Sequence, residues 1–315
     1  MQKRKLGKSG LEIAPLVLGG NVFGWTADEA MSFKLLDKFV GAGFNCIDTA
    51  DTYSRWAPGH QGGESEAIIG KWLKQRGGRE KVVIATKVGM EMGAGKKGLS
   101  KAYILREVED SLKRLQTDYI DLYQSHTDDA ATPLEETLET YALLVSQGKV
   151  RVIGASNYKA DRLALALKAS RERGHPRYES LQPLYNLCER VEYEQTLEPV
   201  CLEQRVGVIP YFSLAAGFLT GKYRSEADLS KSPRGQGIKK YLNERGFRIL
   251  SALDTVSTRY GTPPTAVALA WLLARPSITA PIASATTLDQ LDTLIASTQL
   301  NLDRSAIELL QQASS

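Results

Sequence analysis

Four side chains that can move protons together occur in the first half of the chain: Asp48, Tyr53, Lys87 and His126. Three of them stand at or just beyond the end of a short apolar run, and Tyr53 follows Asp48 by five residues. An ammonium beside a phenol favours the phenolate and lowers the phenol pKa, which is ordinarily about 10. We therefore predict that Tyr53 is a general acid beside Lys87, which Asp48 keeps charged and oriented. His126 is predicted to hydrogen-bond a substrate oxygen, so the set suits reduction of a carbonyl group.

Taken one at a time, these residues have other interpretations. Asp48 and Lys87 can form a buried ion pair that serves only the architecture of the fold. A lysine at a strand end is also compatible with a Schiff-base amine in an unrelated barrel enzyme. The joint pattern favours carbonyl chemistry, because a Schiff-base role for Lys87 leaves Tyr53 and Asp48 without a function.

The elements that must position these residues alternate along the chain. Short apolar runs predict strands at 16–18, 45–48, 82–86, 119–124, 150–154, 180–182, 207–211 and 279–282. Amphipathic patterns predict helices at 28–40, 65–75, 101–115, 134–146, 160–170, 197–204, 246–260 and 288–297. Eight strand and helix units predict an α/β fold, a single (β/α)8 (TIM) barrel domain over residues 1–315. Its active site is expected at the C-terminal ends of the strands.

Two segments go beyond a minimal barrel. Residues 3–6 and 11–14 flank a Lys-Ser-Gly turn and predict an N-terminal β-hairpin that closes the bottom of the barrel. After the seventh predicted strand, residues 215–245 mix glycines and a proline with many basic residues and are too long for an ordinary connection. We predict that this long loop is a functional lid.

Composition narrows the possible partners and locations. The formal net charge is +4 with both signs interspersed, so no nucleic-acid partner is expected. No apolar run approaches the roughly 20 residues that span a bilayer, and the N-terminus lacks the pattern of a secretory signal, so no membrane partner is expected. Cys46, Cys188 and Cys201 fit reduced thiols in a cytoplasmic protein. His60 and His175 share no ligand spacing with them, so no metal site is expected.

Five segments together resemble the aldo-keto reductase family. They are GFNCIDTA at 43–50 with Tyr53, ATK at 85–87, DLYQSH at 121–126, GASN at 154–157 and LTGKY at 219–223. The resemblance extends from about residue 4 to residue 295. The family's catalytic tetrad falls on Asp48, Tyr53, Lys87 and His126 without a substitution, which implies hydride chemistry on a small carbonyl or alcohol substrate.

The resemblance also implies contacts with a nicotinamide cofactor. Ser156, Asn157 and Gln182 are expected to hydrogen-bond the nicotinamide, and Tyr211 to stack on its ring. The implied pyrophosphate contacts are Ser213, Leu214, Gly217 and Lys222, with Arg234 as a clamp on the adenosine phosphate. Ser284, Thr286 and Gln290 are implied at the adenine end.

One departure bears on the choice of cofactor. Many family members carry a basic residue at the place of Thr286 or Thr287, where a guanidinium binds the 2′-phosphate of NADPH. Here Lys222 and Arg234 are expected to supply that charge. NADPH is the predicted cofactor, with NADH as the alternative.

The predicted function is hydride transfer between NADPH and an aldehyde or ketone, with alcohol oxidation in reverse. The alternative is a nicotinamide-binding regulatory subunit, because the resemblance includes barrels that are accessory subunits of channels. The intact tetrad favours the enzyme.

Two features of the loops are less specific. Residues 93–98 match GxGxxG, but the match begins six residues beyond Lys87, so a mobile loop near the substrate is predicted rather than a dinucleotide-binding turn. Trp25 and Trp56 follow the first and second predicted strands and either line an apolar substrate pocket or pack on the surface.

Overall fold

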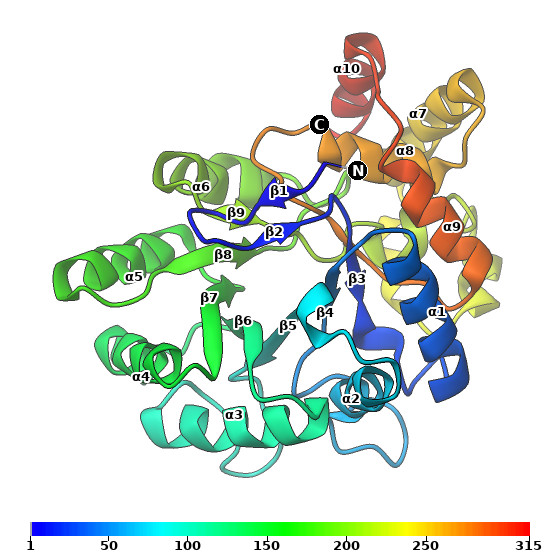
Figure 1. Cartoon of the computed structure of the whole chain (residues 1–315). Coiled ribbons are helices and arrows are strands. Elements are labelled where there is room, and N and C mark those ends of the chain that lie inside the picture. Colours follow the sequence, from blue (N-terminus) through cyan, green and yellow to red (C-terminus); the bar gives the residue numbers. More distant parts are fainter. Residues whose placement is uncertain (1) are drawn as a thin grey trace.

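Eight parallel strands form the centre of the protein (Figure 1). The computed structural model describes residues 2–315. In sheet order the strands are β10 (Ile282–Ala283), β3 (Val17–Gly19), β4 (Cys46–Asp48), β5 (Val83–Val88), β6 (Ile120–Ser125), β7 (Val150–Ser156), β8 (Tyr178–Gln182) and β9 (Gly207–Val208). The amide of Ile282 donates to the carbonyl of Pro210 (3.0 Å), which joins the β9 side to β10 and closes the ring. The predicted (β/α)8 fold is confirmed.

Helices surround the strands on the outside (Figure 1). They are α1 (Glu29–Gly41), α2 (Glu64–Arg76), α3 (Lys101–Leu115), α4 (Leu134–Ser146), α5 (Ala160–Arg173), α6 (Glu198–Gln204), α7 (Glu244–Tyr260), α8 (Pro264–Leu273), α9 (Leu288–Ser297) and α10 (Arg304–Ala313). The eight helices that the sequence predicts all form. The set was incomplete, however, because α8 and α10 were not among the predicted helices.

Local sequence explains where several helices begin and end. The side chain of Asp28 accepts a hydrogen bond from the amide of Met31 (2.7 Å) at the start of α1. Asn243 does the same for the amide of Gly246 (2.9 Å) at the start of α7. Gly261 adopts the left-handed conformation (φ 61°) that ends α7. Such caps satisfy backbone groups that a helix leaves free at its ends.

The N-terminal hairpin closes one end of the barrel, as predicted. Its strands β1 (Arg4–Lys5) and β2 (Glu12–Ile13) pair antiparallel. Leu6 and Ile13 are fully buried in one cluster with apolar side chains of the barrel interior. Arg4 donates to two backbone carbonyls of the segment before β10 (3.1 and 3.2 Å). The hairpin therefore covers the end of the barrel opposite to the C-terminal ends of the strands.

Residues 215–243, called the lid below, lie between β9 and α7. The segment contains three short helical turns, η4 (Ala215–Thr220), η5 (Glu226–Lys231) and η6 (Gly235–Tyr241). A Cβ added to Gly235 would lie 1.7 Å from the carbonyl oxygen of Leu229, so η5 and η6 pack at the closest distance that a glycine permits. The predicted long loop is thus a folded segment with its own packing.

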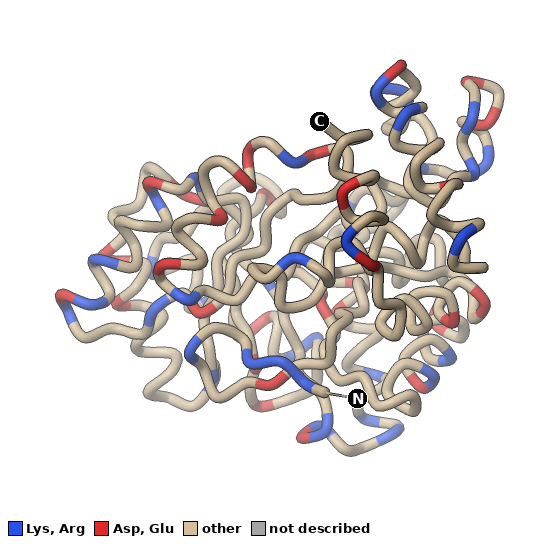
Figure 2. The backbone as a smooth tube through the Cα atoms, turned by 90° about the horizontal axis from the view of Figure 1, so that it is seen from above, with Lys and Arg blue, Asp and Glu red and all other residues tan. Residues whose placement is uncertain are grey.

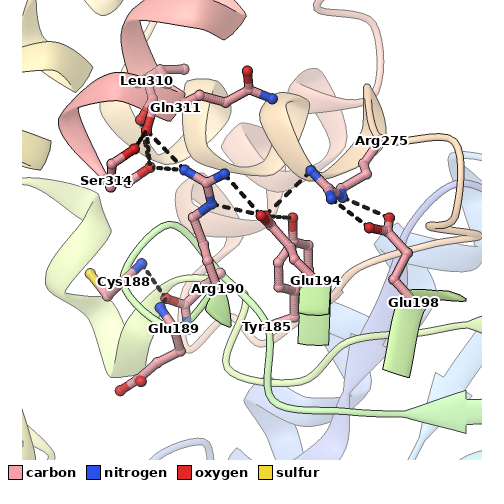
Figure 3. Close-up of polar contacts among 12 residues, drawn as sticks. Tyr185, Cys188, Glu189, Arg190, Glu194, Glu198, Arg275, Leu310, Gln311 and Ser314 are labelled. Carbon is pink, nitrogen blue, oxygen red and sulfur yellow. Dashed lines mark hydrogen bonds and ion pairs between the residues drawn. The ribbon is translucent and has the colours of Figure 1, made fainter. Parts of the chain in front are cut away.

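The last helix is fastened to the barrel by a polar network (Figure 3). Arg190 donates to the carbonyl of Gln311 (2.9 Å) and to the hydroxyl of Ser314 (2.7 Å) at the end of α10. The same guanidinium pairs with Glu194 (2.8 Å), which also lies 3.3 Å from Arg275. One carboxylate therefore serves two arginines, of which Arg190 holds the C-terminal helix in place.

Charged residues of both signs are interspersed along the backbone (Figure 2). No helix within residues 2–315 has the length and apolar character needed to cross a bilayer.

Candidate active site

The residues of the predicted tetrad meet at the C-terminal ends of adjacent strands. Asp48 ends β4, Lys87 lies near the end of β5, and His126 follows β6. The ammonium Nζ of Lys87 donates to Asp48 Oδ2 (2.6 Å) and to the hydroxyl of Tyr53 (2.7 Å). Its third contact is the carbonyl of Thr49 (2.8 Å), so all three hydrogens are used. The Lys87 side chain is fully buried, and this arrangement does not suit a Schiff-base amine.

The ionisation of Tyr53 differs from the expectation. Its hydroxyl also donates to Asp48 Oδ2 (3.2 Å). Burial and then the charge of Asp48 raise the pKa of Tyr53 well above its ordinary value. The expectation of a lowered Tyr53 pKa was therefore wrong, because burial and the neighbouring carboxylate raise it. Burial also lowers the pKa of Lys87, which Asp48 opposes. Tyr53 consequently keeps its proton at neutral pH, which is the form that a proton donor needs.

His126 stands beside this phenol, with the two ring centroids 6.0 Å apart. Burial and then the charge of Lys87 lower the pKa of His126 well below its ordinary value, so the imidazole is neutral at neutral pH. Its Nδ1 is buried and has no hydrogen-bond partner within residues 2–315. Because an unpaired buried N–H is rarer than an unpaired acceptor, we assign the proton to Nε2. His126 can then donate a hydrogen bond from Nε2.

Two buried amides orient Asp48. Gln182 Nε2 donates to Asp48 Oδ1 (2.9 Å), and Gln124 Nε2 donates to the same oxygen (3.3 Å). Sequence reasoning missed Gln124. Side chains two residues apart in a strand lie on the same face, and Gln124 precedes His126 by two residues. This alternation could have predicted that Gln124 faces the tetrad.

The residues predicted to hold the nicotinamide lie together at the ends of β7, β8 and β9. Asn157 donates to the carbonyl of His126 (2.9 Å), and its side-chain oxygen accepts from the hydroxyl of Tyr211 (2.8 Å). Ser156 donates to the carbonyl of Gln182 (2.9 Å). Asn157 adopts a left-handed conformation (φ 56°), which turns its side chain back toward the tetrad side of the strands. The four predicted residues therefore form one linked group next to the tetrad.

The lid begins with a left-handed turn. Residues 215–217 have φ values of 49°, 55° and 101°. The two alanines adopt this left-handed conformation at an energetic cost. Lys222 Nζ lies 3.8 Å from the point that a Cβ on Gly217 would occupy. Two amides of this turn already donate within it, that of Ala215 to the carbonyl of Phe212 (2.7 Å) and that of Gly217 to the carbonyl of Leu214 (2.9 Å).

The residues predicted at the adenine end follow β10. Ser284 donates to the side chain of Asn21 (2.6 Å), and the Thr286 hydroxyl donates to Gln290 Oε1 (3.1 Å). Thr287 caps α9 by accepting from the Gln290 amide (3.3 Å). These hydroxyls hold the backbone in shape but bring no positive charge to this end.

Arg234, predicted as a cofactor clamp, lies over the ring of Trp25, 5.3 Å from its centroid. Trp25 meets Trp56 edge-on with a centroid distance of 5.6 Å. Trp56 in turn lies 6.0 Å from the ring of Tyr53 and is 49% exposed. The indole of Trp56 thus stands beside the phenol of the tetrad, and Trp25 packs against that indole.

The loop with the GxGxxG match is a tight hairpin. The amide of Met92 donates to the carbonyl of Lys96 (2.8 Å), and the amide of Gly98 to that of Gly89 (2.9 Å). Arg55 donates to the carbonyl of Glu91 (2.7 Å), so the hairpin contacts the loop that follows Tyr53.

Over the described range 2–315, no group of three or more His, Cys, Asp or Glu residues is arranged to hold a metal ion.

The fold and the tetrad define a (β/α)8 barrel with a buried polar cluster at its C-terminal mouth. Residues 15–315 match the sequence profile of the Aldo/keto reductase family. The oxidoreductase YrpG of Bacillus subtilis is 36% identical over 318 residues, covering 98% of this chain and 95% of that protein. The aldo-keto reductase YhdN of the same organism is 33% identical over 287 residues, covering 88% and 82%. A putative aryl-alcohol dehydrogenase of Saccharomyces cerevisiae is 30% identical over 325 residues, covering 96% and 84%.

The chain therefore belongs to the Aldo/keto reductase family and is an oxidoreductase. Members of this family generally use nicotinamide cofactors and act on small carbonyl substrates.

Proposed function

We propose that the protein is an NADPH-dependent carbonyl reductase that reduces an aldehyde or ketone and oxidises the alcohol in reverse. The observation that carries the proposal is the position of Lys87 Nζ, within hydrogen-bond distance of both Asp48 and the Tyr53 hydroxyl. A phenol held in this way, beside a neutral imidazole, is equipped to give a proton to a developing alkoxide. The bound nicotinamide supplies the hydride.

Each tetrad residue has one task in this mechanism. The substrate oxygen accepts hydrogen bonds from His126 Nε2 and from the Tyr53 hydroxyl, whose hydrogen turns from Asp48 to the substrate. When the carbonyl carbon gains hydride, Tyr53 transfers its proton to the oxygen, and Lys87 stabilises the phenolate that remains. Asp48 orients Lys87 and is itself held by two glutamine amides. In the oxidative direction the phenolate takes the proton back from the alcohol.

The proposed cofactor contacts follow the order of the barrel. Ser156, Asn157, Gln182 and Tyr211 hold the nicotinamide, Ser213, Leu214, Gly217 and Lys222 the pyrophosphate, and Ser284, Thr286 and Gln290 the adenosine end. The position of Lys222 Nζ beside Gly217 supports the pyrophosphate assignment. Because threonines occupy 286 and 287, the preference for NADPH over NADH is best tested directly, by comparing kcat/KM for the two cofactors.

The substrate is proposed to be an aromatic carbonyl compound. One relative is named a putative aryl-alcohol dehydrogenase, and the paired indoles beside Tyr53 offer flat apolar walls.

We propose that residues 1–315 act as one domain. We also propose a cytoplasmic location, in keeping with three free, buried cysteines.

Replacing Tyr53 by phenylalanine tests the mechanism. We expect Tyr53→Phe to lower kcat about 100- to 10,000-fold, because the general acid is removed, while NADPH binding, followed by fluorescence titration, persists. Tyr103→Phe is the matched control, since it removes a buried hydroxyl that has no partner in the described residues. Full turnover by Tyr53→Phe would contradict the proposal. NADPH binding by the wild type without turnover on a panel of carbonyl compounds would favour a regulatory subunit instead.

A further inference from the structure

Asn186, in the loop that follows β8, carries a fully buried amide that the proposed mechanism does not use. Its Nδ2 donates to the carbonyl of Phe212 (2.9 Å), in the loop that follows β9. Its Oδ1 accepts from the backbone amides of Cys188 (2.7 Å) and Glu189 (3.1 Å). Two donors that face Oδ1 and one carbonyl that faces Nδ2 fix the orientation of the amide. Asn186 therefore ties together the loops that follow two neighbouring strands.

Phe212 has a backbone conformation that a bulky residue rarely adopts. Its φ is 56°, and it is the one aromatic residue among the non-glycine residues with positive φ in the described range 2–315. This left-handed conformation costs energy in a residue with a Cβ. Burial of the ring does not offset the cost, because Phe212 is 48% exposed. The fold holds the carbonyl instead, which accepts from Asn186 and from the amide of Ala215 (2.7 Å).

The left-handed turn brings the ring of Phe212 against the ring of Tyr211. Side chains of consecutive residues in an extended backbone point in opposite directions. Here the two rings meet edge-on, with centroids 5.6 Å apart and an interplanar angle of 87°. The hydroxyl of Tyr211 donates to Asn157, which donates in turn to the carbonyl of His126. Tyr211 is thus held at its hydroxyl by Asn157 and contacted at its ring by Phe212.

We propose that Asn186 is a positioning residue for hydride transfer. By holding the carbonyl of Phe212 it maintains the left-handed turn, and the turn keeps the ring of Tyr211 in the orientation that stacks on the nicotinamide. Asn186 is fully buried, so it acts on the cofactor only through Phe212 and Tyr211. This role rests on the proposed reductase function, in which Tyr211 contacts the nicotinamide. A small displacement of the reacting groups is enough to slow such a transfer.

Two other roles are compatible with parts of this geometry. If Asn186 only stabilises its own loop, its loss lowers the stability of the protein but not the rate of hydride transfer in the folded fraction. If the exposed ring of Phe212 contacts the substrate, its loss raises KM and leaves the rate at saturating substrate unchanged. The variants below separate both roles from the positioning of Tyr211.

Hydrogen exchange in the protein without cofactor tests the hydrogen bond between Asn186 and Phe212. The amides of Tyr211 and Ala215 donate to the carbonyls of Pro183 (3.0 Å) and Phe212 (2.7 Å). Asn186→Ser keeps an oxygen that can accept from the two backbone amides of its own loop, but its side chain is too short to donate to Phe212. We expect the amides of Tyr211 and Ala215 to exchange about fivefold to tenfold faster in this variant, because the turn opens more often.

Asn243→Ser is the matched control. Asn243 also accepts from one amide, that of Gly246, and donates to one carbonyl, that of Lys240 (2.8 Å), but it lies at the start of α7. Serine is also a good residue at a helix start. The control should leave exchange at Tyr211 and Ala215 within about twofold of wild type.

Single-turnover reduction of benzaldehyde by bound NADPH measures the hydride step at saturating substrate. We expect Asn186→Ser to slow this step about 10- to 100-fold, because the nicotinamide is misplaced. The Kd for NADPH, from fluorescence titration, should change by less than about threefold, since the phosphates are proposed to contact other residues. Asn243→Ser should resemble the wild type in both measurements. A wild-type rate in folded Asn186→Ser overturns the proposal.

Phe212→Leu tests the ring contact in a variant that should fold, because this side chain is half exposed. We expect the rate at saturating benzaldehyde to fall about 3- to 10-fold, since an aromatic contact with Tyr211 is lost. Phe247→Leu replaces another exposed phenylalanine, on α7, and should leave the rate within about twofold of wild type. An unchanged rate in Phe212→Leu, with or without a higher KM, overturns the proposal. If Asn186→Ser does not fold, as judged by circular dichroism, this variant decides.

The two kinds of measurement keep this proposal separate from the proposed function. If the wild type oxidises no NADPH with benzaldehyde or with a panel of other carbonyl compounds, the reductase function fails. Exchange at Tyr211 and Ala215 needs no turnover. Equal exchange at these amides in Asn186→Ser and in the wild type overturns the role of Asn186, whether or not the protein is a reductase.

Discussion

Asp51 is a buried acid that the proposed mechanism does not use. Its side chain is fully buried, and neither carboxylate oxygen has a hydrogen-bond partner in the described part of the chain. The nearby Glu66 is satisfied, with Arg114 at 2.6 Å and the Thr86 hydroxyl at 2.5 Å. Burial and then the charge of Glu66 raise the pKa of Asp51 well above its ordinary value. Asp51 therefore retains its proton at pH values where an unfolded chain releases it.

This difference predicts how Asp51→Asn affects stability. Above a pH of about 4 the unfolded state loses the Asp51 proton, whereas the folded state keeps it. As the pH rises, the wild type therefore loses up to about 1.4 kcal/mol of its free energy of unfolding per pH unit through this group. The loss stops when the pH reaches the pKa of Asp51 in the folded state. Asp51→Asn removes that dependence. Its free energy of unfolding, relative to wild type, should rise by about 1 kcal/mol or more between pH 5 and pH 8 in urea titrations.

Asp110→Asn provides the control for that series, because Asp110 is an exposed aspartate on α3. It should change the free energy of unfolding by no more than about 0.5 kcal/mol at either pH. A stability difference between Asp51→Asn and wild type that does not vary with pH would show that Asp51 is ionised in the folded protein.

At the scale of single residues, the sequence predicts positions better than ionisation. Asp48, Lys87 and His126 were found because strand ends in a parallel barrel converge, and the structure brings them together. The direction of the Tyr53 pKa shift was wrong, because desolvation depends on packing by side chains far away in the sequence.

Among the elements, α2 and α3 make an unusually close contact. A Cβ on Gly70, in the middle of α2, would lie 2.1 Å from the carbonyl oxygen of Arg114 near the end of α3. Only a glycine allows the two helices to approach this closely. The contact also brings Arg114 to Glu66, which stabilises the same interface with an ion pair.

Gly70→Ala should therefore destabilise the protein although alanine is the better helix former. We expect a loss of about 1–3 kcal/mol in the free energy of unfolding, because the helices must move apart. Gly41→Ala is the matched control, since Gly41 ends α1 and a Cβ there meets nothing within 4 Å. It should be neutral or stabilise by up to about 1 kcal/mol. Equal effects of the two substitutions in thermal or urea unfolding would refute the close-contact explanation.

The elements that the sequence failed to predict have recognisable causes. All but a few side chains of α8 are buried, so its sequence lacks the polar stripe that marks an amphipathic helix. α10 has such a stripe but follows the eighth unit, where the expected barrel was already complete. β9 and β10 were predicted, at 207–211 and 279–282, but each is only two residues long, because the bounds of such short strands are set by their neighbours rather than by their own sequence.

In the molecule as a whole, Glu194 links the barrel to its C-terminal helix (Figure 3). Its carboxylate accepts from Arg190 (2.8 Å) and Tyr185 (2.7 Å) and lies near Arg275 (3.3 Å). Burial alone would raise the pKa of Glu194, but the hydrogen bonds from Arg190 and Tyr185 outweigh it and lower the pKa. The carboxylate thus remains charged and holds Arg190 against α10.

Glu194→Gln should loosen this attachment. We expect a loss of about 2–3 kcal/mol in the free energy of unfolding, because two half-buried arginines lose their shared counter-charge, together with faster hydrogen exchange in α10. Glu308→Gln breaks an exposed pair with Arg304 and should cost less than about 0.5 kcal/mol. If α10 exchanges no faster in Glu194→Gln than in Glu308→Gln, the network does not hold the helix.

The pairing of β10 with β3 has a consequence for how the protein is made. Ile282 lies opposite Val17 in the ladder, so the seam of the ring joins the first strand of the eight-stranded sheet to be translated to the last. Until β10 is translated, β3 has an open edge that invites association with other chains. A nascent chain that stops short of residue 282 already carries Asp48, Tyr53, Lys87 and His126, yet we expect it to aggregate rather than to work.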